Sequence, residues 1–163
     1  MIKIELNLCE QKLANYIAKG REENNTRKGF KERKQDAKRS SRDINLEGVC
    51  GEIAACKAFD RYPDTEFNVD SPPKHDMMSP LGFTVDVKTA EKGKEFWSAA
   101  EWKNVGDVER YLFVRGRCPE YEICGWARPE EFINPRNVTD VGNGKFYKIS
   151  MDAISTLHKG DDF

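Results

Sequence analysis

The segment from Gly82 to Ala90 constrains the fold most, because apolar and polar side chains alternate along its sequence GFTVDVKTA. A period of two is typical of a half-buried β-strand. Asp86 and Lys88 stand two residues apart, so on a strand their side chains lie on the same face, opposite Val85 and Val87. The sequence therefore predicts a carboxylate and an ammonium close enough to act on one ligand.

A second acid, Asp76, precedes this strand. The intervening residues 79–82, Ser-Pro-Leu-Gly, are typical of a turn. We therefore expect two paired strands, a hairpin that places Asp76 near Asp86.

A third acid, Glu52, lies in a predicted helix that Asp43 or Asn45 caps and that ends near Phe59. Glu52 shares a strip with small residues, and the same helix contains two glycines, each of which costs about 1 kcal/mol in a helix interior. These glycines favour a close approach of the helix to the sheet, with Glu52 directed inward. Glu47, one turn away, is a weaker candidate, and a solvent-facing Glu52 is the alternative.

An acid-x-Lys triplet alone is a weak signal, because the sequence contains five of them. Three lie in predicted helices, where residues two apart do not face each other. Only Asp86 and Lys88 combine strand alternation with an upstream Asp and a preceding helix that carries a glutamate. The joint pattern Glu52, Asp76 and Asp86-Val87-Lys88 is moderately specific.

This pattern resembles the PD-(D/E)XK nuclease superfamily, and in particular its small phage-type members. The resemblance covers roughly residues 45–128, and His75 stands where the motif often has proline. It implies a restriction-endonuclease-like core with Glu52, Asp76, Asp86 and Lys88 as catalytic residues. It also implies metal binding by Asp76, Asp86, Glu52 and the main-chain carbonyl of Val87.

The residue types suit that chemistry. Aspartates supply the hard oxygen ligands that Mg²⁺ prefers, with Mn²⁺ as an alternative. A bound metal polarises the phosphoryl oxygen and lowers the pKa of a bound water, and a lysine beside it stabilises developing negative charge. His75 and Thr89 are expected to support these groups.

Residues 19–42 contain ten Lys or Arg against four Asp or Glu, although the whole chain has a net charge of −1. Clustered cations supply most of the non-specific affinity for nucleic acid. We expect this segment to contact DNA, and RNA is not excluded. The alternative is a solvent-exposed helix without a binding function. The expected contacts come from Arg27, Lys28, Lys31, Lys34, Lys38, Arg39 and Arg42.

Composition excludes other classes. The chain has no apolar run of about 18 residues, so no membrane span is expected. Its first residues lack the apolar core of a signal peptide, so we expect a cytoplasmic protein, in the host cytoplasm if a phage encodes it. Its five cysteines show no zinc-ligand spacing, which favours reduced thiols in the core.

The 163 residues are expected to form one α/β domain, a mixed sheet of four to six strands flanked by helices. Within it, residues 1–44 form a helical, basic N-terminal extension, 45–128 the core with the motifs, and 129–163 a C-terminal strand and helix. Before the motifs, we expect a short strand at 2–8, a helix at 10–23 followed by a break at 24–26, and a strand at 66–69. After them, we expect strands at 111–115, 121–127 and 145–149 and a short helix from Pro129. A terminal helix is expected from Asp152 to about His158, followed by a frayed tail. Residues 96–105 are ambiguous.

The function that these features favour is metal-dependent hydrolysis of DNA phosphodiesters, in a monomer or a homodimer. Two alternatives stay open. The first is a catalytically inactive module of the same fold that binds DNA or a protein partner. The second is a structural protein in which Asp86 and Lys88 form an incidental surface ion pair.

Overall fold

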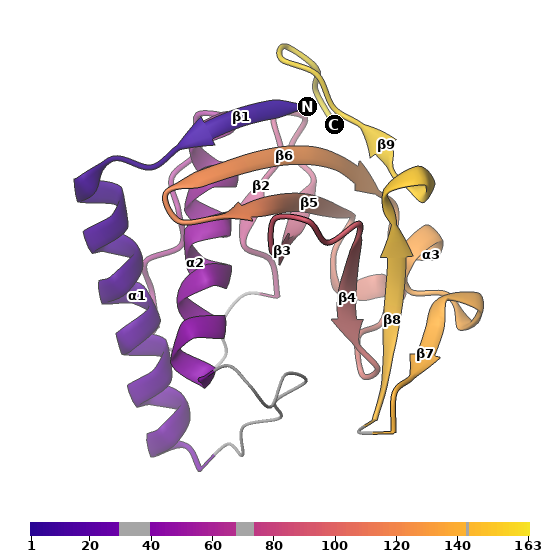
Figure 1. Cartoon of the computed structure of the whole chain (residues 1–163), viewed down its shortest axis with the longest axis horizontal. Coiled ribbons are helices and arrows are strands. Elements are labelled where there is room, and N and C mark those ends of the chain that lie inside the picture. Colours follow the sequence, from indigo (N-terminus) through magenta and orange to yellow (C-terminus); the bar gives the residue numbers. More distant parts are fainter. Residues whose placement is uncertain (30–39, 68–73, 143) are drawn as a thin grey trace.

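The computed structural model describes residues 1–29, 40–67, 74–142 and 144–163. In these ranges the strands form a six-stranded and a three-stranded sheet (Figure 1). The elements are β1 (Ile2–Glu5), α1 (Leu8–Arg27), α2 (Ser41–Ala58), β2 (Met77–Met78), β3 (Thr84–Ala90), β4 (Phe96–Ala100), β5 (Arg110–Arg117), β6 (Glu120–Ala127), α3 (Pro129–Phe132), β7 (Val138–Asp140), β8 (Lys145–Ser150) and β9 (Ser155–Thr156).

The larger sheet is mixed, with the order β1-β6-β5-β3-β2 and β9 beside β6. β3 runs parallel to β5, whereas the β1–β6, β5–β6 and β2–β3 pairs are antiparallel. The connection from β3 to β5 passes through β4, which belongs to the smaller sheet β4-β8-β7. The mixed α/β sheet expected from the sequence is therefore confirmed.

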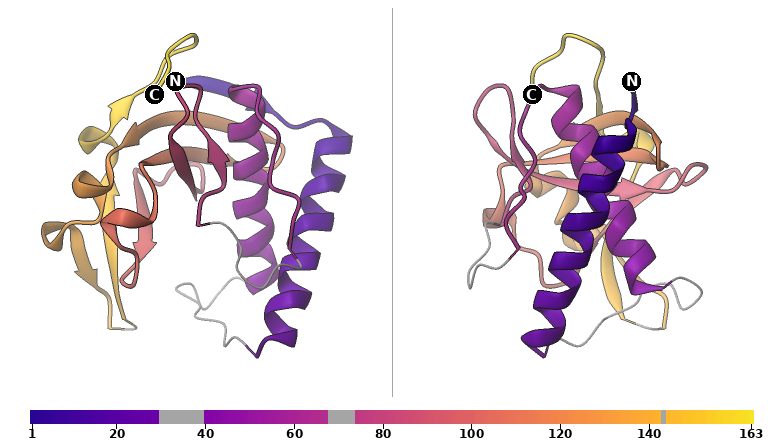
Figure 2. Two further views of the ribbon diagram at one scale, coloured as in Figure 1. Left: turned by 180° about the vertical axis from the view of Figure 1, so that it is seen from behind. Right: turned by 90° about the vertical axis from the view of Figure 1, so that its left-hand side faces the viewer.

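The two faces of the larger sheet have different covers. Helix α2 packs on one face, with α1 beside it, and the smaller sheet packs on the other (Figures 1 and 2). Along β5, Leu112 and Val114 join the core under α2, whereas Tyr111 and Phe113 join the core under the smaller sheet. Helix α3 also lies on the second face, where Phe132 contacts Tyr111 and Phe113, so the expected flanking helices are present. The smaller sheet on this face was not predicted from the sequence.

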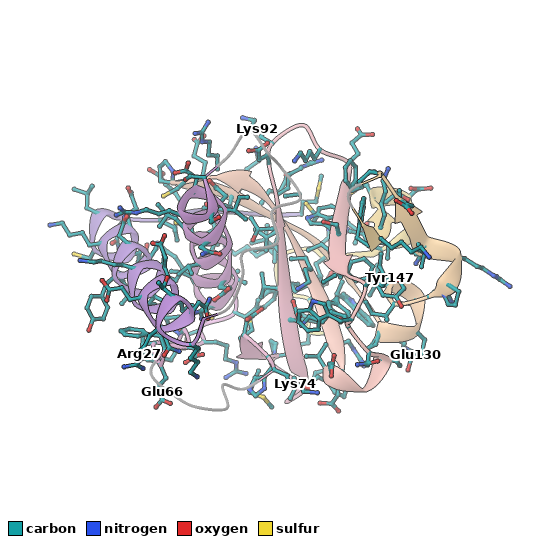
Figure 3. All side chains as sticks on the ribbon, turned by 90° about the horizontal axis from the view of Figure 1, so that it is seen from below. Arg27, Glu66, Lys74, Lys92, Glu130 and Tyr147 are labelled. Atoms are coloured by element: carbon teal, nitrogen blue, oxygen red, sulfur yellow. The ribbon has the colours of Figure 1, made fainter. Side chains whose placement is uncertain are left out.

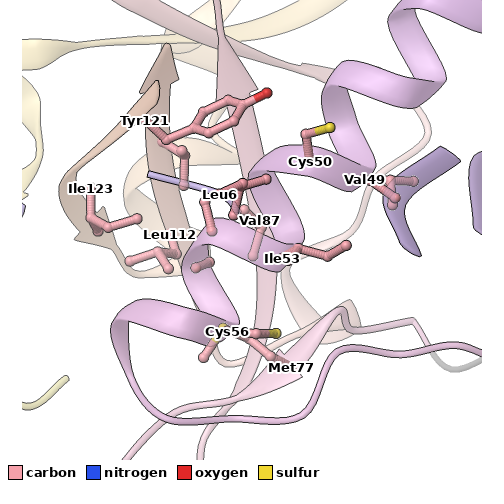
Figure 4. Packing of buried hydrophobic residues seen from close by; sticks show 14 of the residues in the cluster. Leu6, Val49, Cys50, Ile53, Cys56, Met77, Val87, Leu112, Tyr121 and Ile123 are labelled. Carbon is pink, nitrogen blue, oxygen red and sulfur yellow. The ribbon is translucent and has the colours of Figure 1, made fainter. Parts of the chain in front are cut away.

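The core under α2 is made of side chains that alternate on the strands and recur along the helix (Figure 4). Val49, Ile53 and Cys56 of α2 lie against Val87, Leu112 and Ile123 of the sheet, all at most 7% exposed. Burial of such side chains stabilises the fold by about 1.5–3 kcal/mol each. The helix is therefore fixed against β3, which carries the predicted motif.

A hydrogen bond from the smaller sheet reaches the larger sheet where the pairing of β5 and β6 is irregular. The register between β5 and β6 shifts between Phe113 and Val114. The indole Nε1 of buried Trp97, on β4, donates a hydrogen bond to the carbonyl of Val114 at 2.7 Å. A bulge disrupts the ladder locally, and the tryptophan satisfies this carbonyl from the other sheet.

The helical boundaries differ from those expected. The break at 24–26 was wrong: α1 continues to Arg27, and Thr26 bonds the carbonyl of Glu22 inside it. Helix α2 is capped by Ser40, whose hydroxyl accepts from the amide of Asp43. The expected caps, Asp43 and Asn45, lie inside the helix. Ser40 has the extended backbone of an N-cap residue, with a φ of −69° and a ψ of 150°.

In the C-terminal part, the expected helix from Pro129 and strand at 145–149 are confirmed as α3 and β8, whereas the terminal helix and the frayed tail were wrong. β7 was not expected, and in place of a terminal helix the chain forms a 3₁₀ turn at Met151–Ala153 and then β9. The last residue is not frayed, since Phe163 is 2% exposed. Asp152 begins a turn and not a longer helix because β9 pairs with β6 directly afterwards.

The ambiguous residues 96–105 form β4 and the start of a 3₁₀ turn at Val105–Asp107. The strand expected at 66–69 is absent at residues 66 and 67, and the remainder lies outside the described residues. Within the described ranges, no helix combines the length and apolar character needed to cross a membrane.

Candidate functional site

The alternation of β3 is present as the sequence predicts. Val85 and Val87 are buried under α2, and Asp86 and Lys88 point to the opposite face. Asp86 is only 3% exposed. The exposed position that one alternative assumed for this ion pair was therefore wrong, because protein atoms cover the carboxylate. A structural protein in which the pair has no catalytic role stays an alternative.

Asp76 is fixed to β3 by two hydrogen bonds. Its amide donates to the carbonyl of Val85 at 2.8 Å, and its Oδ2 accepts from the amide of Val87 at 2.7 Å. The side chain thus takes the place of a backbone acceptor where the β2–β3 ladder ends. The amide and carbonyl of one strand residue point to the same side, so the Val87 carbonyl also faces this edge.

The expected hairpin positions this aspartate. β2 pairs with β3 through Met77 and Val85, and Gly82 in the connection has a φ of +87°. That conformation favours glycine. The turn chemistry at residues 79–82 therefore brings Asp76 to Asp86, as predicted from the sequence.

Three carboxylates influence one another at this edge. Burial, followed by the negative charges of Glu52 and Asp86, raises the pKa of Asp76 well above its usual value; Lys88 and the Val87 amide act in the opposite direction. Asp76 keeps partial solvent exposure as a residue, but its carboxyl is surrounded by protein atoms. The structure therefore brings Glu52, Asp76, Asp86 and Lys88 together.

Glu52 reaches the site because α2 passes close to β3. A Cβ built on Gly51 would lie 1.9 Å from Thr89 Oγ1, whereas one built on Gly48 would meet nothing within 4 Å. Only Gly51 is therefore required for the close approach. Thr89 Oγ1 is buried beneath the helix without a hydrogen-bond partner.

Arg21, on α1, holds Glu52. Its Nη1 lies 3.0 Å and 2.8 Å from the two carboxylate oxygens, and its Nη2 lies 3.9 Å from Asp64. The side chains of Arg21 and Glu52 are 27% and 16% exposed, so the pair is only partly screened by solvent. Sequence reasoning missed Arg21, which appeared only as one cation of the basic segment.

Two lysines contact Asp86. Lys88 Nζ is paired with Oδ1, and Lys103 Nζ lies 2.6 Å from Oδ2. Lys103 comes from the turn after β4, which the sequence did not resolve as a strand. In the sequence, Lys103 stood out only as part of the acid-x-Lys triplet with Glu101. That triplet did not indicate a contact between Lys103 and Asp86.

The donor set can be compared with the needs of a metal ion. Within the described ranges no group of three or more His, Cys, Asp or Glu side chains is arranged to hold one. Asp76, Asp86 and the Val87 carbonyl nevertheless supply hard oxygens at one strand edge, and Glu52 lies near. These oxygens are the atoms that could hold Mg²⁺ or Mn²⁺, and in this structure Arg21 contacts Glu52 while Lys88 and Lys103 contact Asp86.

Other expected residues lie elsewhere. Glu47 accepts hydrogen bonds from Tyr121 Oη at 2.5 Å and the Cys118 amide at 3.2 Å, so it stabilises the β5–β6 end of the sheet. The cysteines are free, and Cys50, Cys56 and Cys124 are buried.

The predicted nucleic-acid contacts can be placed only in part. Arg27, Lys28 and Arg42 are exposed, and Lys31, Lys34, Lys38 and Arg39 lie outside the described residues. In Figure 3 Arg27 lies at the same side of the molecule as Lys74, which precedes β2, and opposite Lys92, which follows β3. Arg27 and Arg21 are six residues apart on α1, which is roughly 9 Å along the helix.

The comparison with known families covers this whole site. Residues 4–115 match DUF5843, a family of unknown function. The chain belongs to the DUF5843 family. Arg21, Glu52, Asp76, Asp86, Lys88 and Lys103 all lie within the matched range, whereas β6, β7 and β8 lie beyond it. No curated protein matched the chain.

Proposed function

We propose that this DUF5843 protein is a metal-dependent nuclease of the PD-(D/E)XK type that hydrolyses DNA phosphodiester bonds, with a restriction-endonuclease-like core. One observation carries the proposal. Asp76, Asp86 and Lys88 surround Val87 at a strand edge, and a neighbouring helix adds Glu52. Buried like charges without an evident role in stability are typical of functional sites.

Each residue has a distinct role in this proposal. Asp76 and Asp86 would hold Mg²⁺ with the Val87 carbonyl, and Glu52 would complete the ligands or bind a water. The metal supplies Lewis-acid activation of the phosphate and a bound water of lowered pKa. Lys88 orients the attacking water and stabilises negative charge on the phosphoryl oxygens.

The electrostatics of Asp76 support cation binding. Burial, and then the negative charges of Glu52 and Asp86, raise its pKa and so disfavour the ionised form. A divalent cation among the three carboxylates would remove that repulsion. The site therefore gains stability from a cation in proportion to the charge it neutralises.

The placement of the cationic side chains supports DNA as the substrate. Helix α1 contributes Arg21 to the site and ends in Arg27 and Lys28, so the basic segment begins close to the carboxylates. Exposed lysines and arginines bind the phosphate backbone without reading sequence. Affinity for DNA should therefore fall steeply as salt increases.

A second candidate follows from the ion pairs. Arg21 neutralises Glu52, and Lys88 and Lys103 neutralise Asp86, so two of the three acids are paired without a metal. This arrangement favours a catalytically inactive module of the same fold that binds DNA through its basic segment.

The deciding experiment is cleavage of duplex and single-stranded DNA with Mg²⁺ or Mn²⁺. Asp86→Asn and Lys88→Ala should each lower the rate by about 100-fold or more, because each removes a ligand or a charge that acts in the transition state. Lys92→Ala removes an exposed charge at the far end of β3 and should cleave like the wild type.

Equal cleavage by all variants would reveal a contaminating nuclease and reject the site. Salt-sensitive DNA binding without cleavage under any metal would favour the inactive module. Absence of both binding and cleavage would reject both candidates.

A further inference from the structure

The carboxylate of Asp86 has an ammonium at each oxygen. Lys88 Nζ contacts Oδ1, and Lys103 Nζ lies 2.6 Å from Oδ2. The carboxylate side chain is 4% exposed, so water contributes little to its solvation. Both of its oxygens are thus occupied by cations of this chain.

The two lysines differ in how they are held. Lys88 is part of β3 and its Nζ also lies 5.8 Å from the ring centroid of Tyr111, in the adjacent strand. Lys103 comes from a turn in the smaller sheet, and its Nζ lies 5.3 Å from the ring centroid of Trp102, which is 63% exposed. Lys103 Nζ thus contacts Asp86 and an exposed aromatic ring at the same time, and the ring lies on the solvent side of the site.

Its surroundings also offer an acidic partner outside the site. Hydrogen bonds from Lys74, at 2.6 Å, and from the Asn104 amide lower the pKa of Asp107, and the charge of Lys103 adds a smaller effect. An ammonium released from Asp86 can therefore remain near a negative charge. Lys103 can leave Asp86 without becoming an uncompensated buried cation.

We propose that Lys103 occupies the position that a divalent metal takes on Asp86, and that it must leave before the metal binds. The inference rests on the proposed metal site. A metal ion at Oδ2 and an ammonium 2.6 Å from that oxygen would repel each other strongly across a poorly solvated space. Lys103 is thus a positioning residue that holds the carboxylate of Asp86 in place before metal binding and lowers the affinity for metal.

The test is a calorimetric titration of the metal-free protein with Mn²⁺ in the absence of DNA. Lys103→Met removes the charge and keeps the length of the side chain, and should bind Mn²⁺ about tenfold more tightly, or more. Lys92→Met is the matched control and should bind as the wild type does. It removes the same charge from the exposed turn after Ala90, the end of β3, which is about 13 Å along the strand from Asp86.

A second variant and a fluorescence measurement test the role of Lys103 independently of Lys103→Met. Lys103→Gln retains a hydrogen-bond donor for Asp86, and should also bind Mn²⁺ more tightly if Lys103→Met folds poorly. In the wild type, Mn²⁺ should change the fluorescence of Trp102, identified by comparison with Trp102→Phe, because the ammonium beside the ring moves. In Lys103→Met this change should disappear.

The outcomes separate this inference from the proposed function. Equal Mn²⁺ affinity in the wild type, Lys103→Met and Lys103→Gln, abolished by Asp86→Asn, would overturn the role of Lys103 and leave the metal site intact. Binding that is absent in all proteins, or insensitive to Asp86→Asn, would overturn the metal site and the role of Lys103 together. Tighter binding in both Lys103 variants, lost with Asp86→Asn, supports the inference.

Discussion

At the scale of single residues, Asp76 is the side chain whose charge the metal-free fold tolerates least. Burial and the negative charges of Glu52 and Asp86 raise its pKa, and the hydrogen bond from Val87 only partly offsets them. Asp86 is buried too, but two lysines compensate it. The two aspartates at this strand edge thus differ: ion pairs hold Asp86, whereas burial and like charges act on Asp76.

We expect Asp76→Asn to stabilise the metal-free protein near neutral pH. An asparagine Oδ1 can still accept from the Val87 amide, while the repulsion is removed. A gain of a few degrees in Tm is expected, since about 1 kcal/mol shifts Tm by roughly 2–4 °C in a domain of this size. Thermal unfolding in the presence of a chelator measures it.

The gain should depend on pH. Because folding raises the pKa of Asp76, the native state binds more protons than the unfolded state between the two pKa values, so stability falls as pH rises through that window. The penalty is complete above the folded-state pKa and absent below the unfolded one. The advantage of Asp76→Asn should therefore be larger at about pH 8 than at about pH 4, and Asp86→Asn should show no such gain. A constant advantage across pH would contradict this account.

At the scale of elements, the contact between α2 and β3 decides whether Glu52 reaches the site. Gly51 stands against Thr89, whereas Gly48 faces open space. The same sequence signal, a glycine inside a helix, thus has a packing cause at one position and none at the other.

Gly51→Ala should lower the free energy of unfolding by about 1–3 kcal/mol, because the new methyl group would overlap Thr89 and push the helix away from the strand. Gly48→Ala is the matched control and should raise it by up to about 1 kcal/mol through helix propensity. Urea denaturation measures both. Equal effects of the two substitutions would show that α2 is not held against β3 at Gly51.

At the scale of the whole molecule, the end of the sequence is part of the core. Phe163 is buried, and its ring centroid lies 4.9 Å from that of Phe59, after α2, and 6.4 Å from that of Trp126, in β6. β9 pairs with β6 just before it. The C-terminal residues thus connect the helical layer to the larger sheet.

Phe163→Ala should destabilise the fold by about 3 kcal/mol, as large-to-small changes at buried aromatic positions do. The neighbouring Asp162→Ala changes an exposed side chain and should have little effect. Denaturant midpoints at constant slope measure the difference. A similar midpoint for Phe163→Ala and the wild type would mean that the last residue does not pack as described.

Local patterns predicted β3, β5, β6, α3 and the turn before β3, because period-two alternation and turn residues act over a few positions. They also predicted the proximity of Asp76, Asp86 and Lys88, which the hairpin fixes. They failed for β4 and β9, which pair with segments far along the sequence, and for β7, a strand of only three residues that pairs with β8. They also failed at residues 24–26, where side-chain hydrogen bonds within α1 outweigh the weak helix propensity of Asn and Thr.

The sequence by itself determined the strand that carries Asp86 and Lys88 and the helix that carries Glu52, since both are encoded by neighbouring residues. Only the tertiary structure decided that Arg21 holds Glu52 and that Lys103 shares Asp86 with Lys88. Arg21 comes from α1 and Lys103 from the turn that follows β4, and such contacts depend on how the layers pack. The smaller sheet also decided that Asp86 is buried, because a strand pattern shows which face a side chain takes but not what covers that face.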